Sequence, residues 1–189
     1  MNVMEIPDGE SGNWKISEFE VTKDDVAIHN IRAMFSPGSR TIRPGKYKKI
    51  SRNGSVIMSN TDSELRDHRH FVYKANGKVL INGLGLGCVL SEVLAKDRVE
   101  SVTVIEISED VINLVAPFFE SNPKVTIIHA DAFEWKPPRG VRYNAVWHDI
   151  WDNICTDNLP EMTRLHRKYG RRCDYQDSWC RGLCKRYNR

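Results

Sequence analysis

The chain has 189 residues, of which 40% are hydrophobic and 28% are charged, a composition that suits one globular domain, alone or with a small appendage. No apolar run approaches the roughly 18 to 20 residues that cross a bilayer, and residues 1–12 are acidic and polar rather than signal-like, so the sequence predicts a cytoplasmic protein with no membrane partner. The net charge of +3 is unevenly distributed, because residues 164–189 carry nine Lys or Arg against two Asp, and residues 40–52 carry six basic residues and no acid.

The first part of the chain contains signals for a helix, a hairpin and a second helix. Apolar residues recur at helical spacing over residues 24–35, after aspartates that can cap the helix and before a Pro-Gly pair that stops it. Residues 47–51 and 55–59 flank Asn53-Gly54, which supplies the positive φ angles of a tight hairpin turn. Residues 61–75 begin with capping chemistry and place apolar side chains on one helical face.

From Lys78 onwards the pattern changes to short apolar, mostly β-branched runs that are typical of buried strands. These runs occupy residues 79–81, 102–105, 125–128 and 145–147. Segments with apolar helical faces lie between them around residues 89–94 and 111–115, and Pro117 is expected to end the second helix. This alternation of strands and helices predicts a parallel sheet with right-handed crossovers.

Beyond Asp149 the pattern favours helices alone, near residues 158–169 and 175–187. The predicted fold class is therefore α/β, a Rossmann-like parallel sheet with flanking helices, truncated after the fourth core strand. The predicted organisation is a β-hairpin and helix segment over residues 1–76, a Rossmann-like core over residues 77–157 and basic helices over residues 158–189.

A glycine-rich loop links the first predicted core strand to its helix, with Gly83, Gly85 and Gly87 at every second position. Glycine lets the backbone turn sharply and lets a ligand approach amide groups near the positive end of the following helix. Glu106 ends the next strand 19 residues after Gly87, where a carboxylate can accept both hydroxyls of a ribose. Asp131-Ala132 follow the third strand and can present a carboxylate and an apolar wall to adenine. Three strand ends therefore predict one nucleotide-binding crevice.

Two other readings of this crevice are weaker. The glycines can form a plain tight turn, with the acids as solvated strand ends, but the shared topology of the three strand ends argues against that reading. Dinucleotide-binding folds more often use G-x-G-x-x-G, whereas this loop reads G-x-G-x-G and is followed by Cys88.

The ordered motifs resemble the class I S-adenosylmethionine-dependent methyltransferase superfamily, especially its spermidine-synthase-like branch and the small methyltransferase-like proteins of phages. Residues 79–87 resemble the first, cofactor-binding motif, residues 104–107 the ribose-binding second motif, residues 129–134 the adenine-binding segment and residues 143–149 the fourth motif. The resemblance implies that the cofactor is S-adenosylmethionine. It also implies a cofactor-binding set of Gly83, Gly85, Gly87, Glu106, Ile107, Asp131 and Ala132.

The same resemblance implies a transferase whose catalytic acids are Asp149 and Asp152. Methyl transfer from a sulfonium needs mainly the alignment of acceptor and methyl carbon, and Asp149 is the candidate that orients or deprotonates the acceptor. The predicted function is therefore methyl transfer to an unidentified small-molecule acceptor. Two alternatives stay open. One is a binding module without turnover, and the other is aminopropyl transfer, against which Leu86 stands where that branch carries an aspartate.

The remaining motifs favour plainer interpretations. The five cysteines are an odd number and occur without a secretory signal, which favours reduced thiols. They form no C-x-x-C pair, which argues against a zinc site. Residues 67–70 are expected to form a solvated helix face, although the resemblance places this helix beside the mouth of the active site. The basic C-terminal helices leave nucleic-acid binding open, and a homodimer is a further open prediction.

Overall fold

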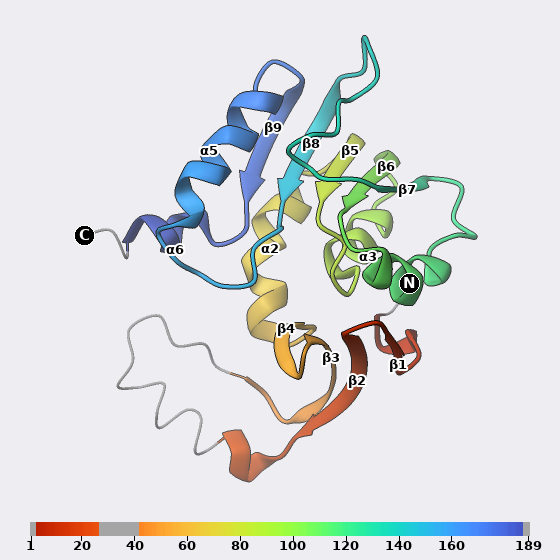
Figure 1. Cartoon of the computed structure of the whole chain (residues 1–189), viewed down its shortest axis with the longest axis vertical. Coiled ribbons are helices and arrows are strands. Elements are labelled where there is room, and N and C mark those ends of the chain that lie inside the picture. Colours follow the sequence, from red (N-terminus) through yellow and green to blue (C-terminus); the bar gives the residue numbers. More distant parts are fainter. Residues whose placement is uncertain (1–2, 27–41, 187–189) are drawn as a thin grey trace.

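The computed structural model describes residues 3–26 and 42–186, and within them it contains two β-sheets (Figure 1). The smaller sheet is antiparallel, in the order β1 (Gly9–Ser11), β2 (Trp14–Val21), β3 (Gly45–Arg52) and β4 (Ser55–Ser59). The larger sheet has the order β7 (Val125–His129), β6 (Val99–Glu106), β5 (Gly77–Asn82), β8 (Tyr143–His148) and β9 (Cys173–Ser178). The helices are α2 (Asp62–Lys74), α3 (Cys88–Leu94), α4 (Glu109–Val115), α5 (Asn158–Tyr169) and α6 (Arg181–Arg186), with 3-10 turns η1 (Val3–Glu5) and η2 (Ala116–Phe118). None of the helices in this described part of the chain is long and apolar enough to cross a membrane.

The larger sheet is Rossmann-like because the first core strand, β5, lies at its centre and the strand order reverses beside it. Each of its neighbouring strand pairs is parallel, as the alternating pattern predicts. Side chains of β5 alternate between two cores: Val79 and Ile81 pack with α2, α3 and α4, whereas Leu80 packs with α5 on the opposite face. Helices therefore cover both faces of the sheet, and the predicted α/β class is confirmed.

The prediction that the sheet ends after four core strands is wrong. Residues 173–178 form β9, which pairs in parallel with β8 from Tyr143 opposite Cys173 to His148 opposite Ser178. Within the predicted helix over 175–187, the described helical part is α6 alone. The sequence of β9, CDYQDS, is polar and lacks the apolar run of a buried strand, so the pattern did not indicate a strand. The helix predicted near residues 158–169 is confirmed as α5, and the C-terminal segment also adds β9 to the sheet between α5 and α6.

The N-terminal predictions are confirmed where the structure describes them. β3 and β4 form the expected hairpin, with φ angles of 50° at Asn53 and 79° at Gly54, as a two-residue turn of left-handed residues requires. α2 forms within the predicted helix over 61–75. β1 and β2 extend the hairpin to four strands, which the sequence patterns did not predict. Most of the helix predicted over 24–35 lies outside the described residues.

The small sheet lies over the carboxyl ends of the parallel strands. Figure 1 shows the arrowheads of β5 and β8 pointing toward β2, β3 and β4, with α2 running between the two sheets. Ligands of open α/β sheets bind at the carboxyl ends of the strands, where the strand order reverses. The N-terminal segment therefore covers the edge of the sheet at which the crevice is predicted.

Candidate active site

The glycine loop between β5 and α3 requires glycine for conformation and for space. Gly83, Gly85 and Gly87 have φ angles of 98°, 50° and 73°, in the left-handed region that other residues disfavour. A Cβ atom on Gly83 would lie 1.9 Å from the Asp149 carbonyl oxygen, and one on Gly85 would lie 2.3 Å from Met58 Sδ. The loop is therefore packed closely between the end of β8 and the small sheet.

Glu106, at the end of β6, is buried and holds the backbone of the glycine loop. Its Oε2 accepts the Leu84 N–H at 2.7 Å, and its Oε1 accepts the Ser108 N–H at 2.8 Å. A carboxylate oxygen has two lone-pair directions, so the same group can also accept ribose hydroxyls. The next residue, Ile107, is 65% exposed and lines the same cavity, where an adenine ring can pack on it.

The loop after β7 is braced by α5. Asp131 Oδ1 accepts the Phe133 N–H at 2.7 Å, which turns the backbone. Lys168 Nζ, from α5, donates to the carbonyl oxygens of Ala132 and Phe133, both at 2.8 Å. The Arg164 guanidinium lies 4.7 Å from the centroid of the Phe133 ring. α5 therefore fixes the segment in which the sequence predicts the adenine contacts, although neither basic residue is recognisable as a partner of this loop from the sequence.

These segments line one cavity of about 640 Å³, which lies beneath the small sheet. Its volume falls within the range of small-molecule and cofactor sites. Of the predicted site residues, those that line it are Gly83, Gly85, Glu106, Ile107, Asp131, Ala132, Asp149 and Asp152. Gly87 does not line the cavity. It is the N-cap of α3, and a Cβ atom there would lie 2.6 Å from the Phe119 ring, so it serves the packing of the loop.

Asp149 follows β8 directly and is enclosed by the cavity wall. Burial is the main reason why the pKa of its carboxyl group is raised from 3.8 to about 6, and the neighbouring acids Glu64 and Asp67 act in the same direction. His68 and a 3.4 Å hydrogen bond donated by Trp147 Nε1 oppose this shift. The group therefore changes its protonation state close to neutral pH, as a general base does.

The wall of the cavity is strongly acidic. Among the described residues that line it, Arg52 is the one Lys or Arg side chain. The same lining contains six carboxylates, which are Glu64, Glu106, Asp131, Asp149, Asp152 and Glu161. Glu64 and Glu161 are site residues that the sequence motifs did not indicate. Glu64 lies in a segment that was interpreted as helix capping, and its carboxylate accepts the Ser59 N–H at 2.7 Å instead of capping the helix. An acidic cavity of this size favours cationic ligands.

The interpretation of residues 67–70 as a solvated face is wrong for His68. This side chain is 3% exposed, lines the cavity and places Nε2 3.5 Å from a carboxylate oxygen of Glu92. Helical spacing from the sequence places His68 on the same face as Phe71, one turn later, and both residues are buried, so this spacing is the better indicator for His68. Arg69 and His70 are exposed, as predicted.

A buried hydrogen bond joins the ends of the two central strands that carry the site. Asn82 Nδ2 donates to His148 Nδ1 at 2.7 Å, and His148 Nε2 donates to Gln176 Oε1 at 3.2 Å. The Asp149 N–H donates to the Asn82 carbonyl oxygen at 2.8 Å. The neutral imidazole therefore helps to hold Gly83 and Asp149 at adjacent strand ends, and burial lowers the pKa of His148 to about 3.

Protonation of His148 should make the fold acid-labile. The pKa of His148 is about 3 in the folded state, whereas its ordinary value is 6.5. Below pH 6.5 the imidazole of His148 is therefore protonated more readily in the unfolded chain than in the folded chain. The contribution of neutral His148 to stability should be complete above pH 6.5 and should fall by at most about 1.4 kcal/mol per pH unit as the pH decreases from 6.5 toward 3. In urea denaturation at pH 7, 5.5 and 4.5, the free energy of unfolding of His148→Gln should fall less with decreasing pH than that of the unsubstituted protein. Exposed His70→Gln is the control and should behave like the unsubstituted protein. Equal losses in all three proteins would contradict a buried, neutral His148.

Comparison with known proteins finds curated relatives that are similar in sequence to about half of this chain. No family model matches the chain. A polyamine aminopropyltransferase of Streptomyces coelicolor is 32% identical over 113 residues, which cover 53% of this chain and 21% of that protein. A polyamine aminopropyltransferase of Leptospira interrogans is 36% identical over 115 residues, which cover 53% of this chain and 23% of that protein. The chain therefore spans about a fifth of the length of these curated relatives.

Two solved structures that match the chain are a spermidine synthase and a methyltransferase. Spermidine synthase from Thermotoga maritima has 21% identity and a TM-score of 0.47, over 80% of this chain and 49% of that one. The 23S rRNA methyltransferase ErmE has 17% identity and a TM-score of 0.46, over 60% of this chain and 46% of that one. The resemblance predicted from the motifs is confirmed by the curated relatives: in sequence the chain is similar to the spermidine-synthase branch, and its sheet has the Rossmann-like order of the class I methyltransferase superfamily.

Proposed function

We propose that the cavity binds S-adenosylmethionine and transfers its methyl group to the nitrogen of an amine acceptor. The observation that carries this proposal is the position of Asp149. Its carboxyl group has a pKa of about 6 and lies in the same cavity as Glu106 and Asp131, the residues predicted to hold the nucleoside. A proton acceptor and a nucleoside site thus share one enclosed space.

The donor fits the strand ends as follows. The ribose hydroxyls bind Glu106, the adenine amino group binds the Asp131 carboxylate, and the ring packs between the apolar side chains of Ile107 and Ala132. The sulfonium is a cation, and the acidic wall compensates its charge. The glycine loop leaves its backbone open to the donor beside Gly83 and Gly85, because neither residue has a side chain.

The acceptor is assigned from the charge of the cavity. An alkylamine is an ammonium near neutral pH and is attracted by Asp149 and its acidic neighbours, but it must lose a proton before it can attack. Above pH 6 the Asp149 carboxylate accepts that proton. The nitrogen lone pair then forms the bond to the methyl carbon while the carbon–sulfur bond breaks. The electron pair of the broken bond stays on sulfur, so the donor leaves as S-adenosylhomocysteine.

Aminopropyl transfer from the decarboxylated donor is a second candidate. The curated relatives are polyamine aminopropyltransferases, which supports it. Leu86 is the observation against it. This side chain is fully buried in the hydrophobic core and does not line the cavity, so position 86 offers no carboxylate to the terminal ammonium of an aminopropyl group. Methyl transfer needs no such partner, which is why we place it first.

Product masses distinguish these functions. The purified chain is incubated with putrescine or butylamine and either S-adenosylmethionine or its decarboxylated form, and the products are identified by mass spectrometry. Methylated amine with the first donor supports the proposal. An aminopropyl product with the second donor alone would replace it with the second candidate. S-adenosylhomocysteine binding without any product would leave a cofactor-binding module.

A further inference from the structure

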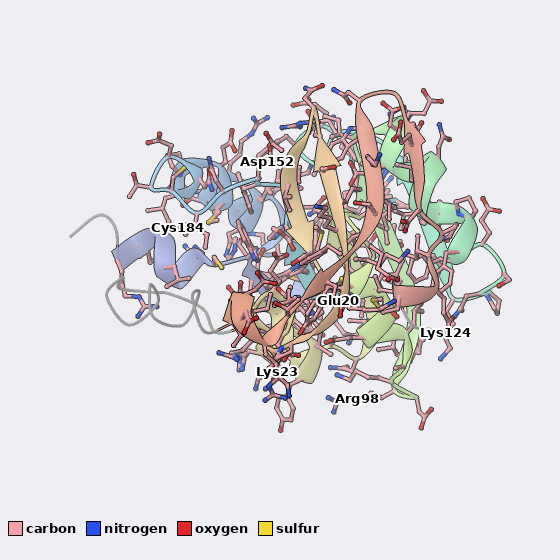
Figure 2. The ribbon with its side chains drawn as sticks, turned by 90° about the horizontal axis from the view of Figure 1, so that it is seen from below. Glu20, Lys23, Arg98, Lys124, Asp152 and Cys184 are labelled. Atoms are coloured by element: carbon pink, nitrogen blue, oxygen red, sulfur yellow. The ribbon has the colours of Figure 1, made fainter. Side chains whose placement is uncertain are left out.

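Arg52 and Asp152 form an ion pair at the mouth of the cavity, between the small sheet and the loop after β8. Arg52 ends β3, and Asp152 lies 100 residues further along the chain. Figure 2 shows Asp152 beside the strands of the small sheet. The pair therefore joins the small sheet to the loop after β8 at a partly exposed edge of the cavity.

The guanidinium of Arg52 is held on both sides. Trp14 is its cross-strand partner at the start of β2, and the Arg52 Cζ atom lies 5.2 Å from the centroid of the Trp14 ring. Both members of the ion pair are partly open to solvent, with 41% of the Arg52 side chain and 42% of the Asp152 side chain exposed. A soluble cation can therefore reach Asp152 and compete with Arg52.

Asp152 lies three residues after Asp149, in the same cavity wall. An amine that presents its reactive nitrogen to Asp149 extends its other end toward the mouth. For a diamine, that end is a second ammonium, and Asp152 is the carboxylate placed to receive it. In the structure, the guanidinium of Arg52 already forms an ion pair with the Asp152 carboxylate and neutralises its charge.

We propose that Arg52 is a specificity-determining residue: its guanidinium occupies Asp152 in place of a second ammonium and so favours monoamine over diamine acceptors. This inference rests on the proposed function, because it requires an amine acceptor beside Asp149. Removal of the guanidinium charge frees Asp152 for the far end of a diamine. It changes nothing for a monoamine of the same length, which has no second charge.

The size of the effect follows from the exposure of the pair. A partly exposed ammonium–carboxylate contact contributes about a two- to fivefold change in affinity. Putrescine should therefore bind Arg52→Gln about two- to fivefold more tightly than it binds the unsubstituted protein. The affinity of butylamine should stay unchanged.

Calorimetric titration of both amines into the full chain saturated with S-adenosylhomocysteine tests the inference. Arg52→Ala is a second neutral variant that should behave like Arg52→Gln, and Arg52→Lys should show no gain because it keeps the charge. Arg43→Gln is the matched control, since Arg43 is exposed and does not line the cavity. The double variant Arg52→Gln with Asp152→Asn should lose the gain.

The outcomes separate the two levels of the proposal. A gain for putrescine alone, cancelled in the double variant, supports selectivity by Arg52. Equal affinity of putrescine for the unsubstituted protein and both neutral variants overturns the role of Arg52 and leaves the proposed function intact. Failure of both amines to bind any variant that still binds S-adenosylhomocysteine overturns the amine acceptor, and with it this inference.

Discussion

An Asp149→Asn variant should lose at least about a hundredfold in kcat/KM and become more stable at the same time. A general acid or base typically increases the rate by roughly 10²–10⁴-fold, and this factor sets the scale of the expected loss. Stability should rise because the raised pKa means that the folded protein prefers the protonated, neutral carboxyl group. The neutral amide keeps that preferred state at pH 8 and should raise the free energy of unfolding by about 1 to 3 kcal/mol.

The sign of the pH dependence gives this prediction a second readout. The stabilising preference for a protonated Asp149 is present below pH 3.8 and is lost as the pH rises through about 6, so the stability gain in the variant should shrink toward pH 4. The kcat/KM of the unsubstituted protein should fall below about pH 6, as the carboxylate takes up a proton. Exposed Asp97→Asn is the control for both measurements. Full turnover by Asp149→Asn would remove Asp149 from the mechanism.

A Gly83→Ala variant should lose about 3 kcal/mol or more of stability, and with it the binding of S-adenosylhomocysteine. The added Cβ would enter a φ of 98° and would meet the Asp149 carbonyl oxygen at 1.9 Å, a backbone atom that cannot rotate away. The loop and the end of β8 would have to separate. Urea denaturation and calorimetry measure the two losses.

Gly140→Ala is a matched control for this substitution. Gly140 has a φ of 80°, but a Cβ atom there would have no atom within 4 Å. This variant should therefore lose only the cost of a left-handed alanine, about 1 to 2 kcal/mol. Equal losses of stability in the two variants would show that the close approach of the loop to Asp149 has no energetic consequence.

Much of the nucleoside half of the site could be predicted from the sequence because its residues follow strand ends. Gly83 follows β5 directly, Glu106 closes β6 and Asp131 comes two residues after β7, and the carboxyl ends of parallel strands share one edge of the sheet. Local pattern and topology were therefore enough to bring them together, and they line one cavity.

The acceptor half was less accessible to sequence analysis because long-range contacts build it. Arg52 meets Asp152 across 100 residues, and Glu161 enters the cavity from a helix whose position depends on β9. That strand was concealed by its polar sequence, in which Gln176 bonds the His166 carbonyl oxygen rather than packing as an apolar side chain. Pairing of distant segments, rather than periodicity, decides these contacts.

The most direct test of the account is calorimetric titration of the folded protein with S-adenosylmethionine, S-adenosylhomocysteine and NAD, repeated on Glu106→Gln. Exposed Glu109→Gln, at the start of α4, is the matched control. The account predicts that the two sulfur nucleosides bind and NAD does not, with affinity reduced by about tenfold or more in Glu106→Gln alone. Absence of binding by all three ligands to the folded protein, or equal affinities in the two variants, would contradict a nucleoside site at these strand ends.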